Sequence, residues 1–194
     1  MTKILLGNKG SGKWMLSCKV SDDIKLAIPR PKIDGPKLFK LLDEQREYFE
    51  YYLPWLQLTK VASDEVEFLQ MTNRHMGTKD SLNLVIWYQN EIAGMISFNH
   101  FDHLRASADI GYWLGKKFQG RGIVTRAVKC IANLGFEDYG LNRVIIQAAV
   151  DNEASNAVAK RAGFILEGTL RQNELLDDGF HDENLYSLLR EDLQ

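Results

Sequence analysis

The stretch Gly111-Tyr-Trp-Leu-Gly-Lys-Lys-Phe-Gln-Gly-Arg-Gly-Ile123 decides which fold this chain adopts. It continues an apolar and aromatic run, passes through a glycine-rich turn and then opens an amphipathic segment. The residue pattern predicts a strand over 108–115 and a helix over 122–137. The unit is therefore a strand, a tight turn and a helix, with glycines at the point where the helix begins.

The glycines of this turn, Gly120 and Gly122, have no side chains that would keep a ligand away from the backbone. Backbone N–H groups in the first turn of a helix lack intrahelical partners, and the helix dipole adds partial positive charge. Both properties suit a pyrophosphate. The pattern is not a dinucleotide fingerprint, because the third glycine would stand at Thr125. A plain glycine-capped turn remains the alternative on these residues alone. Basic residues nearby are Lys116, Lys117 and Arg121.

Outward from this unit, the hydrophobic period changes several times along the chain. Before it, the pattern predicts extended pieces over 1–28, helices over 34–58 and 63–75, and strands over 82–88 and 93–101. After it, the pattern predicts a strand over 144–150, a helix over 152–162 and two strands joined at Asp178-Gly179. No linker or repeat separates these elements. We therefore expect residues 1–194 to form a single α+β (mixed α/β) domain on a mixed sheet.

The composition excludes several classes of protein. Among 194 residues, 24 Lys and Arg stand against 26 Asp and Glu, which gives a net charge of −2. A general nucleic-acid or anionic-membrane binder would carry a basic excess, so neither partner is expected. No apolar run approaches the roughly 18 residues that suggest a membrane span. The two cysteines, Cys18 and Cys130, are too few for a disulfide framework, which favours a cytoplasmic location.

Residues 7–13, GNKGSGK, match most of a phosphate-binding P-loop. Trp14 stands where that loop needs a Ser or Thr for Mg²⁺, and the following residues alternate like a strand instead of forming a helix. A hairpin turn within an N-terminal extension over 1–16 is the preferred interpretation. A nucleotide-binding switch protein is the alternative from another functional class.

His100 and His103 flank Asp102, a pattern that could begin a metal site. No cysteine or second cluster completes four ligands, so a surface loop is the preferred interpretation. We expect no metal.

Two motifs together resemble the GNAT superfamily of N-acetyltransferases. Gln119 to Ile123, QGRGI, is similar to its acetyl-CoA pyrophosphate loop, and Val150 to Phe164, VDNEASNAVAKRAGF, is similar to its second cofactor motif. The pattern N-x-x-S-N-A-V-A, followed by G-F and E-G-T, resembles the RimJ/RimL branch, which acetylates N-terminal amines of ribosomal proteins. The resemblance covers roughly residues 17–190. It implies a GNAT fold, with a central, mostly antiparallel sheet splayed in a V and flanked by helices.

The resemblance also implies acetyl-CoA as co-substrate, bound in the V between the strands at 108–115 and 144–150. Backbone groups near Gly111 would then hydrogen-bond the acetyl and pantetheine part. The residues assigned to this site by resemblance are Tyr112, Trp113, Leu114, Gln119, Gly120, Arg121, Gly122, Ile123, Val124, Asn152, Asn156 and Lys160. The resembled branch further suggests a homodimer.

The resemblance assigns catalytic roles to two residues. Many members of the superfamily have a tyrosine as the acid toward the leaving thiolate, and that position is Ala159 here. In the RimL branch a serine takes the place beside the sulfur, which matches Ser155, and a glutamate is the proposed base, which matches Glu174. The structural alternatives are a helix-surface serine and a solvent-facing strand carboxylate.

The expected reaction is direct attack of a neutral amine on the thioester. A base of modest strength suits an α-amino group, with a pKa near 7.8, better than a lysine near 10.4. An N-terminal amine is therefore preferred, and the resemblance to the RimJ/RimL branch implies that it belongs to a ribosomal protein. A small amine such as a polyamine or an aminoglycoside is the alternative. A covalent route through Cys130 is the rival mechanism, but this residue is interpreted as an apolar filler of the helix.

Overall fold

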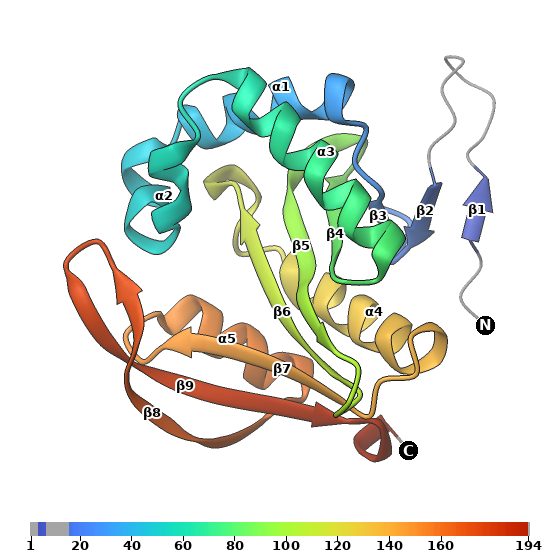
Figure 1. The fold of residues 1–194 in the computed structure, drawn as a ribbon, viewed down its shortest axis with the longest axis vertical. Coiled ribbons are helices and arrows are strands. Elements are labelled where there is room, and N and C mark those ends of the chain that lie inside the picture. Colours follow the sequence, from blue (N-terminus) through green and yellow to red (C-terminus); the bar gives the residue numbers. More distant parts are fainter. Residues whose placement is uncertain (1–3, 7–15, 194) are drawn as a thin grey trace.

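The structure is a computed structural model that describes residues 4–6 and 16–193 (Figure 1). The turn and the P-loop-like motif expected at 7–13 lie outside the described residues. On either side of them, β1 (Ile4–Leu6) and β2 (Leu16–Lys19) pair antiparallel. These two strands extend one edge of the sheet.

In the described part of the chain, nine strands form one sheet in the order β1-β2-β3-β4-β5-β6-β7-β9-β8. The remaining strands are β3 (Ile24–Ala27), β4 (Leu82–Tyr88), β5 (Glu91–Asp102), β6 (Ser107–Leu114), β7 (Arg143–Ala149), β8 (Ile165–Leu176) and β9 (Gly179–Leu189). β6 and β7 pair parallel, whereas the other neighbours pair antiparallel. The predicted mixed, mostly antiparallel sheet is confirmed.

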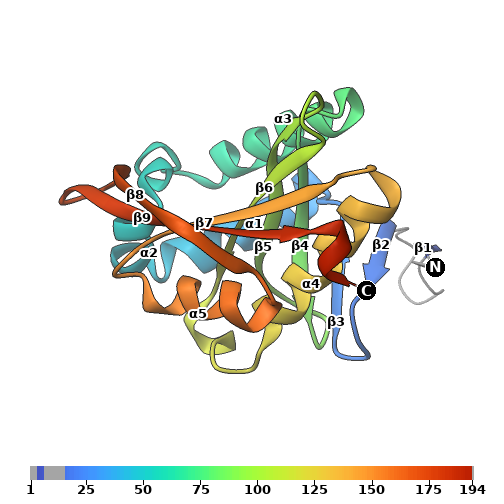
Figure 2. The ribbon, with the colours of Figure 1, turned by 90° about the horizontal axis from the view of Figure 1, so that it is seen from below.

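Helices cover both faces of this sheet (Figure 2). They are α1 (Pro31–Asp43), α2 (Arg46–Tyr52), α3 (Ala62–Thr78), α4 (Ile123–Asp138) and α5 (Glu153–Ala162). Short 3-10 turns are η1 (Pro54–Leu58), η2 (Lys116–Phe118) and η3 (Arg190–Leu193). α4 and α5 pack against each other, and α1 packs against α3.

The single helix expected over 34–58 is wrong, because the structure divides this segment into α1, α2 and η1. The first break is at Gln45, whose φ of −132° is not helical. The second is at Leu53, with φ −127° and ψ 74°. Leu53 precedes Pro54, and a proline lacks an N–H and disfavours the helical conformation in the residue before it.

The two faces of the sheet are distinguished by β5 and β6. Phe98 and Ile110 are cross-strand partners on the face covered by α4, where a methyl group built on Gly135 would lie 2.8 Å from the ring of Phe98. Trp113 lies three residues beyond Ile110, so strand alternation places it on the other face. There its ring centroid is 5.5 Å from that of Phe49 in α2. One face therefore belongs to α4 and α5, and the opposite face contains α2.

β6 and β7 separate soon after they begin, which produces the V visible in Figure 1. Their paired residues are Ser107 with Arg143, Ala108 with Val144, and Asp109 with Ile145. These three pairs form the seam between β6 and β7. Beyond the seam, β6 continues alongside β5, and β7 continues alongside β9. The predicted splay is confirmed, and the side of β6 that faces β7 has no strand partner there from residue 110 to 114 among the described strands.

Candidate active site

The glycine turn leads from β6 into α4. Gly120 and Gly122 have φ values of +73° and +66°, in the left-handed region that disfavours other residues. Among the described residues, a Cβ at either position would meet nothing within 4 Å, so backbone conformation, and not crowding, requires the glycines. Gly122 is the N-cap of α4, and it provides no side-chain cap. The N–H groups of the first helical turn are therefore available to an anion from outside the helix.

Thr125 lies in this first turn, and sequence reasoning missed it as a site residue. Its hydroxyl oxygen is buried and has no hydrogen-bond partner within the described ranges. An unpaired buried hydroxyl is costly, and a phosphate oxygen at the start of α4 would satisfy it. This orphaned group shows that the turn fits a pyrophosphate. A threonine at the third position of a helix has no sequence signature of its own.

Three side chains fix the turn from the protein side. Gln119 donates a hydrogen bond from Nε2 to the hydroxyl oxygen of Tyr48, at 3.0 Å. Ile123 is 1% exposed and belongs to the core. The exposed Arg121 places its guanidinium carbon 5.7 Å from the ring centre of Tyr88. The side chains of Gln119 and Ile123 thus hold the turn in place. A ligand can therefore contact these two residues through their backbone groups.

The unpaired edge of β6 contains Tyr112, Trp113 and Leu114. The side chains of Trp113 and Leu114 are buried, so their contribution at the V is also made by the backbone. The N–H and C=O groups along this edge can form hydrogen bonds with an elongated ligand, as they would with a neighbouring strand. Tyr112 differs, because its side chain crosses toward α5.

The hydroxyl of Tyr112 lies 2.7 Å from Ser155 Oγ and donates to the Ser155 carbonyl oxygen at 3.3 Å. Ser155 is in the first turn of α5, and its N–H is held by the N-cap Asn152 through Oδ1 at 3.1 Å. Burial raises the pKa of Tyr112 to about 12, so its hydroxyl keeps its proton. A Tyr112 O–H directed at both Ser155 oxygens leaves the serine O–H free to point into the V.

The structure shows what the Asn156 side chain does inside the protein, whereas its expected ligand contact stays a prediction. Its side chain is 6% exposed. Its Nδ2 donates to the carbonyl oxygens of Ala149 and Asn152, each at 2.8 Å. Its Oδ1 accepts from Asn184 at 2.7 Å and from the Tyr186 hydroxyl at 2.8 Å. The amide is fully used inside the protein, so Asn156 joins α5 to β7 and β9.

Two other residues expected at the acetyl-CoA site have less defined surroundings. Val124 is half-buried in the first turn of α4, and Lys160 is exposed in the last turn of α5. Their assignments stay predictions.

Glu174 lies on the other side of the sheet from Ser155. Asn184 and Tyr186 of β9 both bond to Asn156 of α5, so this face of β9 points toward α5. Alternation sends His181 to the opposite face, and Glu174 is its cross-strand partner there. The structure thus places the expected base and the expected thiolate donor on opposite faces of the V.

The surroundings of Glu174 make it a base of near-neutral strength. Burial, and then the hydrogen bond and negative charge of Glu183, raise the pKa of Glu174 to about 7. The charge of His181 acts in the other direction. The His181 ring contacts Asp178 at 2.7 Å and Asp151 at 3.2 Å, and these carboxylates raise its pKa.

The structure gives Cys130 a partner that the sequence did not indicate. Its sulfur lies 3.4 Å from that of Cys18 in β2, and both residues are free cysteines. The hydrogen bond with Cys18 and burial raise the pKa of Cys130, which keeps it as a thiol. The same hydrogen bond lowers the pKa of Cys18 to about 7. Cys130 is therefore a poor nucleophile at neutral pH.

Other candidate sites have structural explanations. His103 Nε2 lies 3.1 Å from the Lys79 carbonyl oxygen, and Asp102 pairs with Arg105. Within residues 4–6 and 16–193, no group of three or more His, Cys, Asp or Glu side chains could hold a metal ion. None of the described helices is both long enough and apolar enough for a bilayer crossing.

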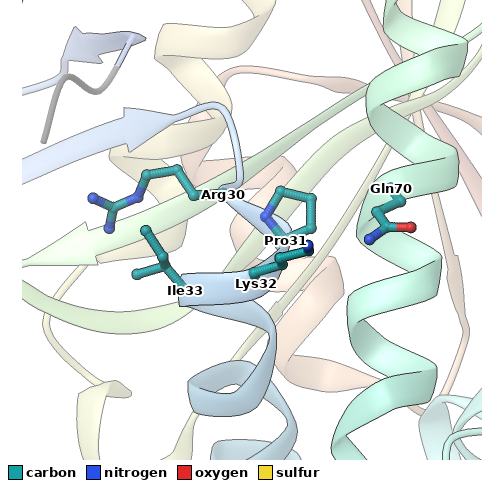
Figure 3. A pocket seen from close by; sticks show the side chains of 5 residues that line it. All are labelled: Arg30, Pro31, Lys32, Ile33 and Gln70. Atoms are coloured by element: carbon teal, nitrogen blue, oxygen red, sulfur yellow. The ribbon is translucent and has the colours of Figure 1, made fainter.

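An open hollow of about 340 Å³ lies between the start of α1 and α3 (Figure 3). It is lined by Arg30, Pro31, Lys32, Ile33 and Gln70. The Arg30 guanidinium is already paired with Asp34 at 2.7 Å. No lining residue belongs to the V or to the glycine turn, so we do not assign this hollow to the chemistry.

Comparison with known proteins agrees with this geometry. A family model described as an acetyltransferase (GNAT) domain matches residues 25–165. The ribosomal-protein-serine acetyltransferase of Escherichia coli (strain K12) is 34% identical over 169 residues, covering 87% of this chain and 94% of that protein. The solved structure of RimL, a ribosomal L7/L12 alpha-N-protein acetyltransferase in complex with coenzyme A, has a TM-score of 0.85 at 31% identity, covering 89% of this chain and 97% of that one.

A second solved structure is also similar. The microcin C7 self-immunity acetyltransferase MccE, in complex with acetyl-CoA and AMP, has a TM-score of 0.84 at 38% identity. The match covers 89% of this chain and 95% of that one. The family model spans well over half of the chain and includes both the splayed strands and the glycine turn. This chain therefore belongs to the GNAT family and is an acetyl-CoA-dependent N-acetyltransferase.

Proposed function

We propose that this enzyme acetylates the N-terminal α-amino group of a ribosomal protein. The observation that carries the proposal is the position of Glu174, a half-buried carboxyl opposite His181 on the face of β9 that points away from α5. Burial and the neighbouring Glu183 raise its pKa to about 7. An α-amino group has a pKa near 7.8, so transfer of its proton to Glu174 costs only about 1 kcal/mol. A lysine side chain, near 10.4, would cost about 4–5 kcal/mol. The names of the similar E. coli enzyme and of RimL support the same acceptor.

Residues on the two faces of the sheet have different roles in the reaction. Glu174, on the α2 face, takes the proton of the attacking amine as the C–N bond forms. Backbone N–H groups of β6 stabilise the oxyanion that develops on the acetyl carbonyl. As the C–S bond breaks, Ser155 on the α5 face donates a hydrogen bond to the thiolate and keeps its proton, while Tyr112 holds the serine oxygen. The thiolate has an ordinary pKa near 8.5, by analogy with cysteine, so a hydrogen bond suffices.

A substitution at Glu174 tests this assignment. Glu174→Gln should lower turnover by about 10²–10⁴-fold with little change in acetyl-CoA affinity. The wild-type rate should rise from pH 6 to pH 8, because the carboxyl ionises with a pKa of about 7, and the loss in the variant should shrink at high pH. Asp177→Asn, in the same hairpin and exposed, is the matched control. Equal rates for Glu174→Gln and the wild type across this range would remove Glu174 from the mechanism.

A panel of acceptors tests the substrate. We expect a peptide that begins with serine to be acetylated in preference to the same peptide with a blocked N-terminus and an internal lysine. The 25% identity over 105 residues to the spermidine N(1)-acetyltransferase of Escherichia coli (strain K12) favours one other candidate, a small-molecule amine acceptor. Spermidine and an aminoglycoside therefore belong in the panel. A higher kcat/KM for one of these than for the peptide would replace the ribosomal-protein proposal with the small-molecule one.

We further propose that the chain forms one domain over 1–194 and acts as a homodimer in the cytoplasm. Its buried apolar residues form one continuous cluster from β3 to β9, which supports a single domain. β8 ends the sheet and exposes Ile165, Leu166 and Leu170, as a dimer interface would. With a net charge of −2, neither nucleic acid nor membrane is proposed as a partner. Light scattering that gives the mass of a monomer at micromolar concentration would exclude the dimer.

A further inference from the structure

Glu183 is a buried carboxylate for which the mechanism above gives no role. Its side chain is 4% exposed. Its Oε2 accepts a hydrogen bond from Gln147 Nε2 at 2.9 Å and from Asn173 Nδ2 at 2.6 Å. Across residues 4–6 and 16–193, no Lys, Arg or His forms an ion pair with it. A buried carboxylate is costly without a partner of opposite charge, so its place next to Glu174 needs a reason.

An irregularity in β8 brings the two glutamates together. Leu170 faces Glu183 and Glu174 faces His181, so residues 171–173 of β8 stand opposite Asp182 alone. Inside this bulge Gln172 has a φ of +50°, and its N–H is held by Asp182 Oδ1 at 2.8 Å. The bulge allows the Asn173 amide to reach Glu183. Bulges of this kind re-aim side chains and are common beside active sites.

Glu174, His181 and Glu183 all lie on one face of the β8–β9 hairpin. His181 and Glu183 are two residues apart on β9, and Glu174 is the cross-strand partner of His181. Gln147 shares this face, because it pairs with Leu185, two residues beyond Glu183. The pair of carboxyls therefore sits on the side of the V that faces away from α5, where the amine is expected.

We propose that Glu183 is a positioning residue whose negative charge beside Glu174 makes the ionised Glu174 carboxylate a stronger base, so that the pair takes up one proton, the one that leaves the amine. The proposal rests on the proposed role of Glu174 as the base. When the amine attacks, its N–H bond breaks, the pair of electrons stays on nitrogen, and the proton becomes the shared proton of the two carboxyls. It leaves to water before the next turnover, so no further reactant is needed.

The electrostatics support this role. Two close carboxylates cannot both ionise easily, so the second charge holds the first proton more tightly. The charged and titratable groups around the pair are His181 on β9, Asp178 at the hairpin turn, Asp151 after β7 and Tyr51 on α2. Of these groups, His181 lowers the pKa of Glu174, whereas the charge of Glu183 raises it. Removal of the Glu183 charge should therefore lower the pKa of Glu174 and weaken it as a base.

The test is a titration of the Glu174 side-chain carboxyl carbon by NMR in the free enzyme. Glu183→Gln should move the midpoint down by about one pH unit, which is tenfold in proton affinity. Glu183→Asp, which keeps the charge, should largely restore it, and Asp177→Asn should leave it in place. The acid limb of kcat/KM should move to lower pH together with the titration. A merely structural role would change the rate without moving either midpoint.

Two outcomes separate this inference from the proposed function. An unchanged Glu174 midpoint in folded Glu183→Gln would overturn the shared proton, whatever the activity. An active Glu174→Gln would overturn the base assignment, while the titration still reports on the pair. Should Glu183→Gln not fold, Gln147→Met tests the pair from the other side. It removes a donor to the Glu183 carboxylate, so the Glu174 midpoint should rise, and an unchanged midpoint there would equally overturn the proposal.

Discussion

Replacement of Asn156 by leucine should cost a measurable fraction of the stability of an average domain, although the two side chains are similar in size. The change removes four hydrogen bonds but does not leave four groups unpaired. The Asn152 carbonyl still accepts the helical N–H of residue 156 at 3.0 Å, and the half-exposed Asn184 can reach water. The Ala149 carbonyl still accepts the Asn152 N–H at 3.0 Å. The group that loses its partner is therefore the Tyr186 hydroxyl, in a residue that is 1% exposed.

The magnitude follows from this one orphaned hydroxyl. A buried unpaired group costs about 1–3 kcal/mol, so Asn156→Leu should lower the free energy of unfolding by about that amount. That compares with a total of about 5–15 kcal/mol for a typical domain. Urea unfolding followed by circular dichroism measures the difference. Tyr186→Phe added to Asn156→Leu removes one orphaned hydroxyl and should recover about 1–3 kcal/mol.

Two results would refute this reasoning. A loss below about 1 kcal/mol in Asn156→Leu would mean that the amide network contributes no more than an ordinary contact. A double variant no more stable than Asn156→Leu alone would mean that the tyrosine hydroxyl is not the group left unpaired.

Three further predictions concern the acetyl-CoA side and the cysteine pair. Thr125→Val should stabilise the free enzyme, because it removes an orphaned hydroxyl, and thermal unfolding measures this gain. The same change should weaken acetyl-CoA binding by about 10–100-fold, which calorimetric titration measures. Gly122→Glu should abolish acetyl-CoA binding by repelling the pyrophosphate, whereas Gly122→Ala, equally strained at a φ of +66°, should retain measurable affinity; equal losses in the two would contradict the anion site. Cys130→Ala should keep most activity with sequential kinetics, and a labelled acetyl-enzyme that disappears in this variant would show a covalent route.

The elements that the sequence predicts well are those with a local signal. The strand and helix around the glycine turn follow from periodicity, and the structure places α4 within one residue of the expected range. The break before Pro54 also has a local signal, since proline restricts the residue before it. The longer apolar spacing from 34 to 58 obscured that signal, which explains the single helix that the structure replaces with three segments.

The contacts that define the site have no local signal. Tyr112 and Ser155 meet across 43 residues, and Glu183 approaches Glu174 only because a bulge shifts the register of β8. The residues that these contacts join carry no sequence pattern that predicts the splay of the strands or the bulge in β8. Asn156 shows a further limit, since an asparagine near a helix start suits both a ligand contact and an internal link. Only the positions of Asn184 and Tyr186 distinguish the two.

The short seam between β6 and β7 has a consequence for the amount of folded enzyme. Three residue pairs join the two parts of the sheet there, and the strands beyond them share no ladder. A ligand that lies in the V and binds only the native state stabilises that state by mass action, by about 2.7 kcal/mol when its concentration is 100 times its dissociation constant. Acetyl-CoA supply should therefore influence how much of this protein survives proteolysis. In cells that are short of acetyl-CoA, the protein should be degraded faster.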